Sequence, residues 1–116
     1  MQLDINSVLA AQTLLNGFID KTPLVPSYYL SDVLKNEFLL KLENMQPIGS
    51  FKIRGAISSV LNLPKDTRVV TCCSTGNHGR GVAYAARLRG IKAVIFMSSL
   101  VPKVKIEAIK NLGAEV

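Results

Sequence analysis

A lysine near the start of a predicted helix is the side chain best suited to covalent chemistry. Residues 49–56 read Gly-Ser-Phe-Lys-Ile-Arg-Gly-Ala, with Lys52 at the centre. Ser50 has a residue type that favours the helix N-cap, because its hydroxyl can accept from a backbone N–H of the first turn. Apolar residues recur behind it at helical spacing, at Ile53, Ala56, Ile57, Val60 and Leu61.

The predicted position of Lys52 is unusual for a helix chosen only for stability. A cation in the first turn opposes the helix dipole, which favours anions there. This position favours an amine that gives up its proton, or an amine beside a bound anion, as a lysine that forms a Schiff base requires. The alternative is a solvent-exposed lysine without a role, and for an isolated segment of this kind that is the more frequent case.

A second polar turn follows the next predicted strand. It reads Ser74-Thr75-Gly76-Asn77-His78, and its hydroxyls, amide side chain and helix N-terminal N–H groups suit a carboxylate or another anion. Both turns follow strand ends, where ligands bind in open α/β sheets. The alternative is turn formation alone, since Ser and Asn are common caps. The turn matches neither the GxGxxG nor the GxxxxGK(S/T) motif of nucleotide-binding proteins, so no nucleotide site is predicted. His78 has no acidic or cysteine neighbour, so no metal site is predicted.

The remaining chain alternates between helix and strand patterns. Helices are predicted over residues 5–18 (with Asp4 as cap), 31–35, 50–61, 79–89 and 102–112, and extended segments over 22–26, 37–42, 68–73, 92–97 and 114–116. This order predicts an α/β fold with a parallel sheet, flanking helices and right-handed crossovers. Because the sequence stops at the start of a strand pattern, we expect it to be the N-terminal piece of a longer protein.

Composition limits the classes of partner. With 116 residues, 48% of them apolar, the chain is predicted to be globular. The net charge of +6 is spread along the chain without interleaved aromatic residues, so nucleic acid is not expected as a partner. No apolar stretch is long enough to cross a bilayer, so a membrane is not expected either. Cys72 and Cys73 are interpreted as reduced, buried residues of a cytoplasmic protein, with a catalytic thiol as the minor alternative.

Two long segments resemble a known family. Residues 41–56 (Lys-Leu-Glu-Asn-Met-Gln-Pro-Ile-Gly-Ser-Phe-Lys-Ile-Arg-Gly-Ala) resemble the lysine segment of fold-type II pyridoxal-phosphate enzymes. Residues 74–83 (Ser-Thr-Gly-Asn-His-Gly-Arg-Gly-Val-Ala) resemble the asparagine loop of that family. Residues 22–24 and 112–116 resemble its flanking landmarks. The nearest branch is that of threonine/serine dehydratases and serine racemases.

The resemblance implies roles for these residues. Lys52 would form a Schiff base with pyridoxal 5'-phosphate and then take the α-proton of a small amino-acid substrate, and β-elimination would give a 2-oxo acid and ammonia. Phe51 would pack near the cofactor ring, and Asn77 would bind its phenolic oxygen. The substrate carboxylate would be bound by the turn, through Ser74, Thr75, Gly76, Asn77 and His78.

The resemblance also implies a tryptophan-synthase-β-like architecture. Residues 1–66 would begin a large cofactor-binding domain, and residues 67–116 would form most of a small domain. The full-length enzyme would be a homo-oligomer. The glycine-rich phosphate loop and the partner of the pyridine nitrogen lie downstream in the family.

Departures from the family pattern leave alternatives open. Thr75 stands where dehydratases of this group have alanine and racemases have serine, so an amino-acid racemase is an alternative. Arg80 replaces a more usual glutamine and Ile48 a more usual threonine, and the loop resembles that of the dehydratase of hydroxyectoine breakdown. A non-catalytic α/β module that binds a small anion is the alternative from another class.

We expect residues 1–116 alone to be catalytically inactive, because they lack the phosphate loop of the family. Mixing this chain with pyridoxal phosphate and serine checks the expectation by absorbance and by product formation. Strong cofactor absorbance together with serine turnover would contradict it.

Overall fold

The computed structural model describes residues 4–116 and shows helices alternating with short strands. The elements are α1 (Ile5–Leu15), β1 (Leu24–Pro26), α2 (Tyr28–Leu34), β2 (Leu39–Lys41), the 3-10 turn η1 (Glu43–Met45), α3 (Lys52–Leu61), β3 (Val69–Cys73), α4 (Asn77–Arg89), β4 (Lys92–Phe96) and α5 (Lys103–Lys110). In the described part of the chain, no helix combines the length and apolarity needed to cross a bilayer.

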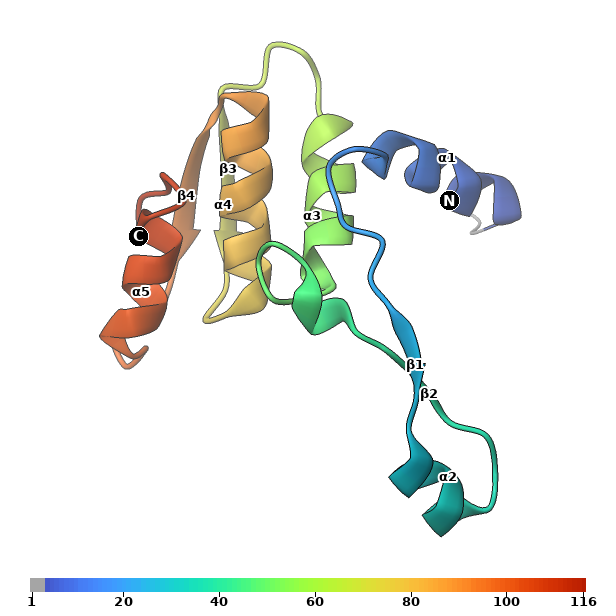
Figure 1. The fold of residues 1–116 in the computed structure, drawn as a ribbon. Helices are drawn as coiled ribbons and strands as arrows, with labels where there is room; N and C mark the ends of the chain where they lie inside the picture. The colour runs from blue at the N-terminus through green and yellow to red at the C-terminus, as the bar shows by residue number, and fades with distance from the viewer. Residues whose placement is uncertain (1–3) are drawn as a thin grey trace.

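The central layer is a parallel strand pair. β3 pairs with β4 in register from Val69 opposite Lys92 to Cys73 opposite Phe96, and Glu115 adds a parallel bridge to Val94. Figure 1 shows α4 in front of this pair, with α3 on one side of it and α5 on the other. The predicted α/β class with parallel strands is therefore confirmed, and the predicted extended segment at residues 114–116 joins the sheet.

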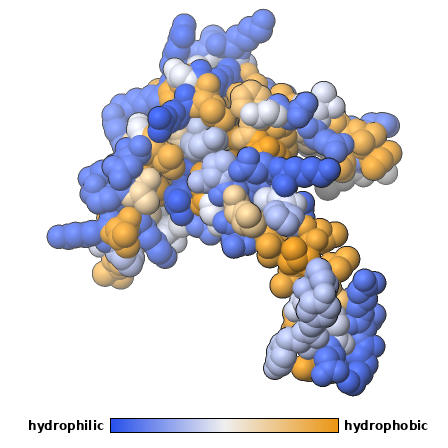
Figure 2. Space-filling view, viewed as in Figure 1, coloured by the Kyte–Doolittle hydropathy of each residue, from blue (hydrophilic) through white to orange (hydrophobic). Residues whose placement is uncertain are grey.

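A separate arm is formed by the first two strands. β1 and β2 pair antiparallel, with Val25 opposite Leu40, and α2 connects them at the tip of the arm (Figure 1). The sequence predicted both extended segments but not their antiparallel pairing. Apolar side chains stay exposed on the arm, among them Leu24 and Leu39. Figure 2 shows hydrophobic surface where the arm leaves the body.

The largest differences from the predicted helix boundaries are in α1 and α2. α1 is capped by Asp4, whose carboxylate accepts from the Ser7 N–H at 2.8 Å, as predicted. It ends at Leu15 instead of residue 18, because Gly17 takes a positive φ of 83° that no continuing helix allows. α2 starts at Tyr28, before the predicted residue 31, because Ser27 caps it.

The two cysteines are less buried than predicted. Cys72 is partly exposed and Cys73 is exposed, and both are free thiols. They alternate between the two faces of β3. Helix α4 lies on one face and partly covers Cys72, whereas Cys73 points away from it, so the prediction that both are buried was wrong.

The core lies between α3, α4 and the sheet. Its largest fully buried side chains are all isoleucine: Ile48, Ile53, Ile57, Ile95 and Ile109. Small residues on α4 let the helices approach closely. A Cβ on Gly81 would lie 3.0 Å from the Cβ of Ala56 and 3.3 Å from the carbonyl oxygen of Lys52. The backbone of Lys52 is therefore in contact with the first half of α4.

Both ends of the α3–α4 contact are defined, and they show that the two helices run parallel. At the C-terminal ends, the Arg89 guanidinium donates to the carbonyl oxygens of Val60 and Pro64. At the other end, Gly81 meets Lys52. The N-termini of α3 and α4 thus lie side by side, at the end of the molecule to which the carboxyl end of β3 points (Figure 1).

We predict that Gly81→Ala destabilises the protein by about 1–3 kcal/mol, because the added methyl group must displace helix backbone. Urea unfolding measures the change. Gly55→Ala is the matched control: Gly55 lies in α3 with no atom within 4 Å of its built Cβ, so the substitution should stabilise by about 0.5–1 kcal/mol. Equal midpoints for the two variants would show that the close approach at Gly81 is not a constraint.

Candidate active site

Lys52 is the first residue of α3, and its side chain is exposed. Its Nζ lies 4.6 Å from the centroid of the Phe51 ring, a distance at which the ring face attracts a cation. Phe51 is itself 56% exposed. The structure therefore presents an amine and an aromatic ring together at the surface, an arrangement that suits a group with both an aldehyde and a ring.

The backbone beneath Lys52 is held in place although its side chain is not. Ser50 is buried, and its Oγ accepts from the Lys52 N–H at 3.3 Å. The N-cap of α3 is Phe51, so the prediction that Ser50 caps the helix was wrong: Ser50 lies one position before the cap, and its hydroxyl binds the first N–H of the helix. Ile48 is 1% exposed, and Gly49 has a φ of +71°, in the region that favours glycine.

An ion pair connects the loop before Lys52 to the helix after it. Arg54 donates from Nε and Nη2 to the two carboxylate oxygens of Glu43, both at 2.7 Å. The Thr22 hydroxyl donates to the same carboxylate at 2.6 Å. The guanidinium contact, with help from the hydroxyl, lowers the pKa of Glu43 to about 2 and raises that of Arg54. Neither Glu43 nor Arg54 was identified from the sequence as part of the site.

The predicted anion-binding turn lies at the start of α4. Its residues Thr75, Asn77 and His78 are exposed, and Gly76 is partly buried. Ser74 Oγ accepts from the N–H groups of Gly76 at 3.3 Å and of Gly79 at 2.9 Å. This is the turn-forming role that we kept as an alternative. In these two bonds the Ser74 hydroxyl only accepts, so its hydrogen remains able to donate. The same residue can therefore shape the turn and donate to a carboxylate.

The structure brings the two halves of the predicted site to the same end of the molecule. Lys52 begins α3, Asn77 begins α4, and the two helices are packed in parallel. Leading N–H groups of a helix have no partner within it, so this end carries partial positive charge. An exposed amine, an aromatic ring and an anion-binding helix end therefore face the same region.

A cavity of about 330 Å³ adjoins the turn, between α4 and α5. It is lined by Gly76, Asn77, Arg80, Val104, Lys105, Ala108 and Ile109. The Nε of Arg80 is buried and has no hydrogen-bond partner among residues 4–116. Arg80 stood out in the sequence as a departure from the family pattern, whereas no motif indicated Lys105. The two cations make this side of the turn suitable for an anionic group.

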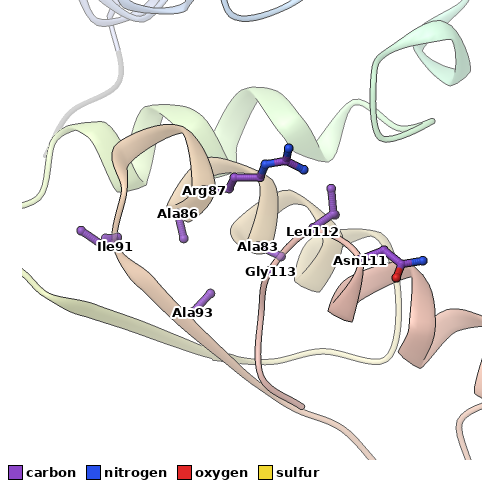
Figure 3. A pocket seen from close by; sticks show the side chains of 8 residues that line it. All are labelled: Ala83, Ala86, Arg87, Ile91, Ala93, Asn111, Leu112 and Gly113. Atoms are coloured by element: carbon purple, nitrogen blue, oxygen red, sulfur yellow. The ribbon is translucent and has the colours of Figure 1, made fainter.

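A second hollow, of about 320 Å³, contains none of the predicted site residues. Figure 3 shows it between α4, β4 and the segment after α5. It is lined by Ala83, Ala86, Arg87, Ile91, Ala93, Asn111, Leu112 and Gly113. Most of these side chains are short and apolar, and they offer no nucleophile, so this hollow is not the candidate active site.

Comparison with known proteins identifies the family. The family model described as pyridoxal-phosphate dependent enzyme matches residues 15–116. A putative threonine dehydratase of Sinorhizobium fredii is 43% identical over 98% of this chain, and an L-threonine ammonia-lyase of Thermotoga maritima is 41% identical over 98%. The chain belongs to the family of pyridoxal-phosphate-dependent enzymes. It spans 35% and 29% of the lengths of these two relatives.

Solved structures with the same fold belong to enzymes of two activities, racemases and a deaminase. A pyridoxal 5'-phosphate-dependent aspartate racemase has a TM-score of 0.93 and 30% identity, over 100% of this chain and 37% of its own. Maize serine racemase has a TM-score of 0.91 and 34% identity, over 99% and 36%. A threonine deaminase from T.th. has a TM-score of 0.88 and 38% identity, over 98% and 36%. The resemblance to the dehydratase and racemase branch is thus confirmed.

The described residues fit part of the cofactor of this family. The Lys52 amine and the exposed Phe51 ring suit its aldehyde and its ring, and the amide of Asn77 suits a ring oxygen. The family thereby confirms the predicted cofactor class, pyridoxal 5'-phosphate. The role of each single residue stays a prediction.

The low pKa of Glu43 predicts a pH-dependent stability. The ion pair contributes fully above the ordinary carboxyl value of 4.5, and the contribution is lost as the pH falls toward about 2. We expect a loss of about 1–2 kcal/mol, because Arg54 is 37% exposed and water screens the pair.

The measurement is the urea midpoint between pH 4.5 and 2, compared with Arg54→Met, in which this part of the decline should disappear. Glu37→Gln, at an exposed glutamate, is the control and should follow the unaltered protein. If the carbon resonance of the Glu43 carboxyl titrates at its ordinary value, the pair does not hold the charge as described.

Proposed function

We propose that this chain carries the lysine segment and the substrate-carboxylate turn of a pyridoxal-phosphate-dependent ammonia-lyase that acts on a small β-hydroxy amino acid. The observation that supports it best is the exposed pair of Lys52 and Phe51, set beside the N-terminus of α4. Two relatives named threonine dehydratase and threonine ammonia-lyase support the reaction class. The substrate class is serine or threonine.

The residues divide the work according to their chemistry. When bound, the cofactor withdraws electrons from the α-carbon of the amino acid. Lys52 Nζ would hold the cofactor through its aldehyde carbon, and the same amine would take the α-proton of the substrate. Phe51 would pack beside the cofactor ring, and the Asn77 amide would donate to its phenolic oxygen.

The turn holds the other end of the substrate. The hydroxyls of Ser74 and Thr75 and the N–H groups around Gly76, Asn77 and His78 bind the carboxylate, which orients the α-hydrogen toward Lys52. The α-proton goes to Lys52 and the β-hydroxyl leaves with a proton as water. The released enamine then takes up water, and the products are a 2-oxo acid and ammonia.

Racemisation is the second candidate activity, and it rests on Thr75. A hydroxyl at this position, exposed at the start of the α4 turn, can carry a proton on the side of the substrate opposite to Lys52. Two of the structural neighbours are racemases of aspartate and serine. We further infer a cytoplasmic homo-oligomer and a domain boundary near residues 66–67.

Replacing Lys52 by arginine in the complete gene product should lower serine or threonine turnover about a thousandfold or more, because arginine keeps the charge but supplies no nucleophilic amine. Borohydride reduction of the unaltered protein with pyridoxal phosphate should leave one pyridoxyl group, on Lys52, detected by peptide mass spectrometry. Lys41→Arg is the control and should keep the label. A label on another lysine would refute the assignment, and binding of small anions without any label would favour the non-catalytic module.

Thr75→Ala separates the two activities. We expect racemisation of serine to fall about 100-fold while formation of the 2-oxo acid changes by only a few-fold, because only racemisation needs a proton donor on the second face. Chiral chromatography and a 2-oxo acid assay on the same samples measure both. Equal loss of the two activities would assign Thr75 to substrate binding alone.

A further inference from the structure

We propose that Glu43 is a positioning residue for Lys52: through its two-point contact with Arg54, it fixes the direction in which α3 presents the Lys52 amine. The inference rests on the proposed function, since it takes Lys52 to be the amine that binds the cofactor aldehyde. It adds a residue that touches neither substrate nor cofactor. The role follows from where the Glu43–Arg54 pair lies relative to Lys52.

The pair closes the segment that carries Lys52. Glu43 begins η1, Arg54 lies in the first turn of α3, and Lys52 lies between them. Both guanidinium contacts measure 2.7 Å, one to each carboxylate oxygen. A bidentate contact of this kind fixes an angle as well as a distance, because the guanidinium is a planar fork. A single point charge would leave the helix free to turn.

The geometry of an α-helix connects this angle to Lys52. With 3.6 residues a turn, Arg54 lies about 200° around the helix from Lys52. The pair therefore holds α3 from roughly the side opposite to the amine. Lys52 is the first residue of the helix, where intrahelical hydrogen bonds hold the backbone least. Any rotation of this turn that breaks the pair swings the amine through the same angle.

The carboxylate is itself held by residues outside the segment. Thr22 donates its hydroxyl to Glu43 at 2.6 Å, and Gln46 approaches it with Nε2 at 3.5 Å. The Gln46 amide bonds both backbone groups of Asp20, at 3.1 and 2.9 Å. Thr22 and Gln46 are 4% and 3% exposed. The pair thus ties the first turn of α3 to the buried side chains of Thr22 and Gln46.

Packing holds the backbone of Lys52 against α4, but it does not orient the exposed side chain. The amine and the Phe51 ring are exposed, as access by a cofactor requires, so no neighbouring core holds them. The fixed points lie behind them, at the buried Ser50 and at the Glu43–Arg54 pair. A reactive group on such a support is oriented before its ligand arrives, which saves the cost of ordering it on binding.

The test compares two labelling rates at Lys52 in the complete gene product. Pyridoxal phosphate with borohydride labels the amine only when it points at the seated cofactor, whereas formaldehyde with cyanoborohydride needs only an accessible amine. We expect Glu43→Gln to lower the ratio of the first rate to the second about tenfold. Peptide mass spectrometry follows both labels at Lys52.

Matched variants separate orientation from stability. Val60→Ala removes buried volume from the same helix, away from Lys52, and should leave the ratio unchanged while it lowers stability. Arg54→Met should match Glu43→Gln, and the double variant should be no worse, because both lose the same contact. Arg54→Lys keeps the charge without the fork, and we expect an intermediate ratio.

The outcomes are distinct. An unchanged ratio in Glu43→Gln, an equal fall in Val60→Ala, or effects that add in the double variant would each overturn the proposal. A pyridoxyl label on a residue other than Lys52 in the unaltered protein is a different failure. It would refute the proposed function before any variant at Glu43 is compared.

Discussion

The close contact between α3 and α4 is the constraint on which the candidate site depends. Gly81 lets the two backbones approach until the carbonyl oxygen of Lys52 lies beside α4. Arg89 fixes the far ends of the same helices through the carbonyl groups of Val60 and Pro64. With both ends defined, the helix that carries the amine begins about one helical turn from the start of the helix that carries the predicted anion-binding turn, at the same end of the molecule. Chemistry that needs an amine and an oriented carboxylate follows from that alignment.

Local sequence patterns predicted the elements well because most of them are decided by short-range chemistry. The Asp4 cap, the prolines around β1, the β-branched run of β3 and the positive φ of Gly113 each act within a few residues. The antiparallel pairing of β1 with β2 was missed, because it depends on contacts between segments that local periodicity does not encode. Cys73 was misplaced for a similar reason: its burial depends on which face of β3 α4 covers.

The residues of the candidate site also fall into two groups: those that local sequence indicates and those that only long-range contacts reveal. Lys52 and the residues of the 74–78 turn could be proposed from the sequence because each has a distinctive type at a predicted helix start. Glu43 and Arg54 were missed because either one alone is an ordinary charged residue, and they meet only when η1 folds back onto α3. Lys105 lines the same cavity as Arg80 only because α5 packs beside α4. Supporting residues of this kind become visible through contacts, which a single sequence does not display.

Positive charge gathers at one side of the candidate site. The chain carries an excess of positive charge, and at the start of α4 the helix end, Arg80 and Lys105 all favour an anion. Beside this positive region, the face of the Phe51 ring lies 4.6 Å from Lys52 Nζ and attracts the ammonium when no aldehyde is present. Under the proposed function, an aldehyde with an aromatic ring would replace that contact by a covalent bond, and Phe51 would pack against the new ring. The fold places the amine, its aromatic neighbour and the predicted anion-binding turn at one end of the molecule before any ligand binds.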